Sequence, residues 1–165
     1  MTVAKGETLK TRTKLMYGSG DFGFACTDAM LGLLIAIYLT DVVGLRPEYA
    51  GLAIFLGRTW DYVNDPIFGY ISDRTRTRWG RRRPYLLFGA LPFALAFSLL
   101  WWHPPIPSQI GLAVYYAVAY ALYDTAATLV YMPYYALTPE LTNDYDQRTS
   151  LTTFRMIFSI LGSMV

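Results

Sequence analysis

The sequence has little cysteine, little histidine and little charge. It contains one cysteine, Cys26, and one histidine, His103, so an internal disulfide is excluded and no cysteine–histidine metal site is indicated. Charged residues make up 16% of the chain, below the roughly 25% typical of soluble domains. These absences argue against a soluble domain. We also find no nucleophile–base pair, which argues against a membrane enzyme.

Apolar residues are abundant instead. Hydrophobic residues make up 54% and aromatic residues 16%, with a mean hydropathy of +0.28. A bilayer core of about 30 Å requires a helix of about 20 mostly apolar residues. We expect five such spans, at about 15–39, 48–71, 85–102, 110–137 and 150–165. The last is still apolar where the sequence stops, so we expect it to be incomplete. The predicted fold is an all-α membrane bundle.

Polar or proline-rich segments separate these runs. Four lysines and arginines precede the first run, and six arginines lie in the segment 72–84. The opposite loops carry only Arg46. Because lysine and arginine accumulate on the cytoplasmic side, we expect a cytoplasmic N-terminus in the plasma or inner membrane. A basic cluster between two spans favours this anchoring role over nucleic-acid binding.

Charged residues also occur inside the predicted spans, and there are seven of them: Asp21, Asp28, Arg58, Asp61, Asp65, Asp124 and Arg155. Each costs at least about 2.5–3.5 kcal/mol at mid-membrane, so a shared polar interior is expected. Arg58, Asp61 and Asp65 lie on one helical face. The two aspartates repel each other at low dielectric. A Na⁺ or H⁺ between them would offset this repulsion, and Asn64 adds a carbonyl oxygen that a hard cation prefers.

Two alternatives remain open from these residues alone. The charges could be ion pairs that hold helices together, with Arg58 bound to Asp61 and Arg155 to another aspartate. Carboxyl groups left over would then be neutral, because burial favours the uncharged form. The tyrosines Tyr131 and Tyr135 fit either stacking on sugar rings or an interfacial aromatic belt.

Six stretches of sequence carry a family resemblance. They are RTWDYVNDP (58–66), GYISDRTRTRWGRRRP (69–84), KLMYGSGDFG (14–23), TDVVGL (40–45), MPYYALTPELT (132–142) and RTSLTTFR (148–155). In these stretches the chain resembles the N-terminal portion of the glycoside–pentoside–hexuronide:cation symporters. This family belongs to the major facilitator superfamily and includes the melibiose permease.

The resemblance implies a fold of twelve transmembrane helices in two halves, of which this chain holds about five. It implies symport of a sugar or glycoside with Na⁺, Li⁺ or H⁺ by alternating access. No cofactor is expected, and no metal beyond a transported Na⁺. The implied partners are the solute, a monovalent cation, the bilayer and a missing C-terminal half.

The resemblance also assigns residues. The implied cation-binding residues are Asp61, Asn64, Asp65 and Thr128. The family's sugar-contacting positions correspond here to Phe24, Ala25, Tyr131 and Tyr135, and Asp28 is a substitute hydroxyl acceptor one turn further on. The expected substrate-binding residues are therefore Asp28, Arg58, Tyr131, Tyr135 and Arg155. The expected cytoplasmic gating loop comprises Gly69, Asp73, Arg74, Gly80, Arg81 and Arg82. A truncated or split transporter without independent activity is the alternative function.

Overall fold

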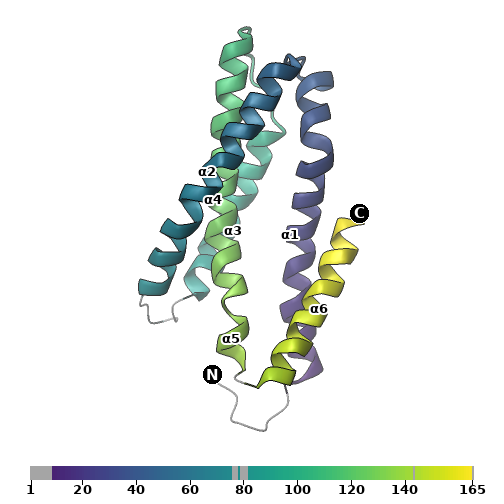
Figure 1. Ribbon diagram of the computed structural model, residues 1–165, viewed down its shortest axis with the longest axis vertical. Helices are drawn as coiled ribbons and strands as arrows, with labels where there is room; N and C mark the ends of the chain where they lie inside the picture. The colour runs from purple at the N-terminus through teal and green to yellow at the C-terminus, as the bar shows by residue number, and fades with distance from the viewer. Residues whose placement is uncertain (1–8, 76–77, 79–81, 143, 165) are drawn as a thin grey trace. The chain divides into compact units, whose positions relative to one another are not determined.

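The computed structural model describes residues 9–75, 78, 82–142 and 144–164, with Asp73 and Arg83 described by their backbone. Within these residues every regular element is a helix, as Figure 1 shows. The elements are α1 (Thr11–Ile37), the π-helical segment η1 (Tyr38–Val42), α2 (Pro47–Arg74), α3 (Arg83–Leu100), α4 (Gln109–Tyr135), α5 (Thr138–Leu141) and α6 (Tyr145–Ser163). The prediction of an all-α protein is confirmed.

The helix ends have local causes. Proline occupies the first turn of both α2 and α3, where its missing N–H costs no hydrogen bond. Gly44, with φ of 73°, makes the turn before α2, which glycine adopts readily. The helix α6 begins five residues before the expected range, because the side chain of Asp144 accepts a hydrogen bond from the Asp146 backbone N–H and caps it.

One helix in the described part of the chain, Thr11–Val42, is long and apolar enough to cross a bilayer when judged by length and composition. Pro84–Leu100 is a shorter apolar helix. The helices α2 and α4 carry charged residues and many tyrosines, which lower their hydropathy. The five predicted spans therefore stay a prediction.

The chain divides into two compact units. The described part of unit 1 comprises residues 9–35 and 136–164, and unit 2 comprises Ala36–Tyr135. In unit 2, α4 packs against both α2 and α3 (Figure 1). Glycines permit this close approach: a Cβ atom at Gly57 would lie 2.6 Å from Tyr120, and one at Gly89 would lie 2.7 Å from Val130.

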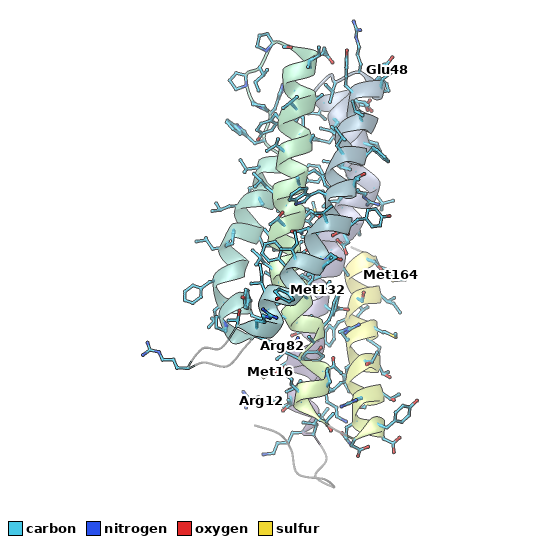
Figure 2. The ribbon with its side chains drawn as sticks, turned by 60° about the vertical axis from the view of Figure 1, so that its left-hand side comes forward. Arg12, Met16, Glu48, Arg82, Met132 and Met164 are labelled. Atoms are coloured by element: carbon cyan, nitrogen blue, oxygen red, sulfur yellow. The ribbon has the colours of Figure 1, made fainter. Side chains whose placement is uncertain are left out.

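One end of unit 2 is held by an amide clamp. Gln109 Oε1 accepts from the Arg46 backbone N–H, and Gln109 Nε2 donates to the Gly44 carbonyl, both over 3.0 Å. The clamp ties the first turn of α4 to the loop before α2. Glu48, in the first turn of α2, lies at this end, and Arg82 lies at the opposite end of unit 2 (Figure 2).

In unit 1, α1 and α6 approach closely. Cys26 Sγ donates to the Gly162 carbonyl over 3.3 Å, and Lys14 Nζ donates to Ser150 Oγ over 2.9 Å. A Cβ atom at Gly162 would lie 2.5 Å from the backbone oxygen of Phe22. The glycine therefore allows the two backbones to meet, as small residues do between membrane helices.

Candidate cation and solute site

Hydrogen bonds join α2 to α4 at a nearly constant sequence offset. Arg58 Nε donates to the Tyr120 hydroxyl over 3.1 Å, Trp60 Nε1 donates to Thr125 Oγ1 over 2.9 Å, and Asn64 Nδ2 donates to Thr128 Oγ1 over 3.0 Å. The offsets are 62, 65 and 64 residues. Residue numbers rise together along both helices, so the helices run in the same direction. We call these three bonds the α2–α4 ladder.

The last bond of the ladder, together with a second hydrogen bond made by Thr128, involves three of the four predicted cation-binding residues. Thr128 accepts from Asn64 and donates its own hydroxyl proton to Asp65 Oδ1 over 3.1 Å. Asn64 is 1% exposed and Thr128 is 4% exposed. Asp61 is a close electrostatic neighbour of Asp65. The structure thus brings the four predicted residues together within unit 2.

The chemistry of this group suits a hard monovalent cation. Asn64 Oδ1 is buried without a hydrogen-bond partner, and such an atom normally has one. A cation beside it would be held by carboxylate, amide and hydroxyl oxygens, which are ligands of hard ions. In the described part of the chain, no three His, Cys, Asp or Glu side chains gather as a metal site.

Sequence reasoning did not include Asp124 in the predicted site. Asp124 lies on α4 one turn before Thr128, and its electrostatic neighbours are Asp61, Asp65 and Arg58. Its Oδ2 atom is buried without a hydrogen-bond partner. The matching four-residue spacings Asp61–Asp65 and Asp124–Thr128 were visible in the sequence. Only the register of the two helices shows that these spacings face each other.

Three predicted substrate-binding residues lie in unit 2. Arg58 is exposed, and its guanidinium is oriented by Tyr120. The rings of Tyr131 and Tyr135 have centroids 6.0 Å apart, and Phe93 lies 6.1 Å from Tyr131. Tyr135 is 41% exposed. These rings form an aromatic surface at the end of α4, which is compatible with both interpretations of the tyrosines.

The other two predicted substrate-binding residues, Asp28 and Arg155, lie in unit 1. Asp28 is exposed within the described residues. Arg155 Nε lies 3.6 Å from Asp21 Oδ2, and the two side chains are 23% and 9% exposed. This contact matches the ion-pair alternative, in which Arg155 pairs with an aspartate. Asp21 was outside the predicted site, since its partner lies on a helix more than a hundred residues away in sequence.

The predicted gating loop is described in part. Gly69 and Arg74 lie in α2, and the Arg74 guanidinium stands 4.1 Å from the centroid of the Tyr70 ring. Arg82 precedes α3, and Asp73 contributes backbone to α2. Gly80 and Arg81 lie outside the described residues. The gating role of the loop stays a prediction.

Polar and charged side chains between two long helices are typical of the interior of membrane transport proteins. The family described as MFS/sugar transport protein matches residues 16–165, and the chain belongs to this family. The resemblance found in the sequence is thereby confirmed. The family is one of transporters, which also confirms the expectation that the chain is not an enzyme.

Known relatives are symporters. An uncharacterised symporter of Synechocystis is 45% identical and covers 96% of this chain and 30% of the relative. The inner membrane symporter YicJ of Escherichia coli is 36% identical, covering 98% of this chain and 35% of the relative. The sodium-dependent lysophosphatidylcholine symporter 1 of Gallus gallus is 35% identical, and the match covers 96% of this chain and 30% of the relative. The chain thus spans about a third of the length of the curated relatives it matches.

Proposed function

We propose that this chain is the cation-binding N-terminal part of a symporter that moves a sugar or glycoside together with Na⁺, Li⁺ or H⁺. The observation that carries the proposal is the hydrogen-bonded chain from Asn64 through Thr128 to Asp65, with Asp61 beside it. It combines buried polar groups, adjacent carboxylates and an unpartnered amide oxygen on two neighbouring helices.

Charge neutralisation is the proposed coupling step. Asp61 and Asp65 are like charges one helical turn apart, and their repulsion grows as water is excluded. A bound cation offsets this repulsion and so lowers the free energy of the conformation that is closed around the solute. A ligand shifts such an equilibrium only by its differential affinity for the two conformations. The cation therefore has to bind the closed conformation more tightly for coupling to occur.

A sugar or glycoside is the proposed solute. The description of the family names sugar transport, and Tyr131 and Tyr135 offer aromatic faces on which a sugar ring could stack. Arg58, Asp28 and Arg155 are the proposed hydroxyl partners. The relative in Gallus gallus is named as a lysophosphatidylcholine symporter, so a lysophospholipid is the comparison solute in any uptake assay.

The proposed orientation places the N-terminus in the cytoplasm. Arg74 ends α2 and Arg82 precedes α3, at the end of unit 2 opposite Glu48. Positive residues gather on the cytoplasmic side of membrane helices. In this orientation, the gating residues Asp73, Arg74 and Arg82 lie at the cytoplasmic ends of α2 and α3.

Uptake by membrane vesicles tests the proposal. Vesicles carrying the protein from its complete gene are given imposed Na⁺, Li⁺ or proton gradients, with labelled sugars, glycosides or lysophosphatidylcholine outside. Gradient-driven uptake of a sugar or glycoside is the expected result. Uptake of lysophosphatidylcholine alone overturns the solute assignment. Uptake that no gradient stimulates overturns cation coupling. The absence of any uptake favours the alternative of a protein without independent transport activity.

A further inference from the structure

The α2–α4 ladder predicts which residues face each other between its bonds. The sequence offsets between hydrogen-bonded partners on the two helices run from 62 to 65 residues. Asp61 lies between Arg58 and Asn64 on α2, so the same register places it opposite Asp124 on α4. The two carboxylates therefore share one level of the ladder, between the Arg58–Tyr120 bond and the Asn64–Thr128 bond.

The surroundings of Asp124 agree with this register. Asp61, Asp65 and Arg58 are its charged neighbours. Its Oδ2 atom is buried with no hydrogen-bond partner. Asp124 is thus an acidic neighbour of the proposed cation site.

We propose that Asp124 sets the cation affinity of this site through its negative charge. It raises the affinities for Na⁺ and Li⁺ equally and does not contact the ion as a ligand. The inference rests on the proposed function, because it requires a cation at Asp61, Asn64, Asp65 and Thr128. Three acidic side chains, those of Asp61, Asp65 and Asp124, lie near one guanidinium, that of Arg58. A neutral residue at Asp124 removes one of the negative charges that this group can carry.

Charge and coordination predict different signatures. A charge one turn away attracts Na⁺ and Li⁺ equally, because both carry one positive charge and Coulomb energy depends on charge and distance. A direct ligand discriminates between them, because cavity size and ligand number decide selectivity between ions of different radius. The ratio of Na⁺ to Li⁺ affinity therefore separates the two roles, and the affinities themselves separate both roles from helix packing.

The test measures cation binding to purified protein from the complete gene. Na⁺ and Li⁺ are titrated separately, with thermal unfolding temperature as the readout, so transport is not required. Asp124→Asn keeps the shape of the side chain and removes the charge, while Asp124→Glu keeps the charge. Asp41→Asn, at an exposed position in η1, is the matched control. Asp124→Ser is a second neutral variant where Asp124→Asn is poorly folded.

We expect Asp124→Asn to raise the half-saturating concentrations of Na⁺ and Li⁺ by the same factor, about tenfold or more at an effective dielectric near 20. Asp124→Glu and Asp41→Asn should stay close to the unmodified protein. Unchanged affinities in both neutral variants overturn the inference in favour of a packing role. A changed Na⁺-to-Li⁺ ratio overturns it in favour of a ligand role. An unmodified protein that binds neither ion overturns the proposed Na⁺ or Li⁺ site and this inference with it.

Discussion

The hydroxyl group of Thr128 in α4 donates a hydrogen bond to the carboxylate of Asp65 in α2, over 3.1 Å. The same hydroxyl accepts from Asn64 over 3.0 Å. A threonine hydroxyl has one proton to donate and two lone pairs to accept, so this arrangement orients both α2 side chains from one atom. It fixes the amide nitrogen of Asn64 toward Thr128 and leaves its oxygen for another partner.

Thr128→Val should therefore impair cation binding while leaving the helix packing nearly unchanged. Valine has the shape of threonine, but it leaves the buried Asn64 amide and the Asp65 carboxylate without their common partner, at a cost of about 1–3 kcal/mol. We expect the Na⁺ concentration that half-saturates the protein to rise by about tenfold. Thr128→Ser, which keeps the hydroxyl, is the control. An unchanged Na⁺ affinity in the valine variant would exclude Thr128 from the site.

The ion pair between Asp21 and Arg155 should contribute to the stability of unit 1. Asp21 is 6% exposed, so Arg155→Gln leaves a buried carboxylate without its cationic neighbour. We expect the free energy of unfolding to fall by about 3 kcal/mol. The double variant Asp21→Asn/Arg155→Gln should lose less than the single Arg155→Gln variant. Chemical denaturation in detergent measures the free energy of unfolding of the two single variants, Asp21→Asn and Arg155→Gln, and of the double variant. A loss in the double variant equal to the sum of the two single losses would argue against a coupled pair.

Gly162 should tolerate no side chain. A Cβ atom there would lie 2.5 Å from the Phe22 backbone oxygen, and backbone cannot move as a flexible side chain does. Gly162→Ala should lower the free energy of unfolding by about 1–3 kcal/mol. Gly23→Ala is the matched control in the same unit, since nothing lies within 4 Å of its added Cβ. The control should be neutral or stabilising, because alanine is the better helix former.

An equal loss of unfolding free energy in Gly162→Ala and Gly23→Ala would contradict the close contact between α1 and α6. A loss confined to Gly162→Ala supports it. Thermal unfolding of both purified variants, compared with the unmodified protein under the same detergent conditions, makes the distinction.

The proposed orientation can be tested by chemical labelling. In a Cys26→Ser background, Arg78→Cys should react only with reagents that reach the cytoplasmic side, and Glu48→Cys only with reagents from outside. Both positions are exposed, so access of the reagent should depend on the side of the membrane. Labelling of Arg78→Cys by an impermeant maleimide added to intact cells would reverse the predicted topology.

Much of the helical architecture was predictable from the sequence, for a simple reason. Long apolar runs interrupted by Pro47, Gly44 and a polar arginine-rich segment leave few alternatives to helices and turns. The start of α6 was harder to predict from the sequence, because the polar residues at 145–149 resemble a loop. Their helical state depends on the cap that Asp144 provides, a contact between neighbours that composition does not reveal.

The residues that α2 contributes to the candidate site were predictable from the sequence. Their partners on α4 were less so. The spacing of Asp61, Asn64 and Asp65 places them on one face of a helix, which periodicity alone indicates. The position of Asp124 required the register between two helices, and that register depends on packing details such as the contact of Gly57 with Tyr120. In the same way, the sequence predicted an aspartate partner for Arg155 without selecting Asp21.

The most direct test of cation coupling is Na⁺-stimulated solute uptake by vesicles that carry Asp65→Asn, in the protein from its complete gene. Asparagine keeps an acceptor oxygen for Thr128 but removes the negative charge that a cation would neutralise. We predict that stimulation by Na⁺, Li⁺ and H⁺ is lost, while Asp41→Asn retains it. Full stimulation by all three ions in Asp65→Asn would contradict the proposal that this carboxylate binds the coupling cation.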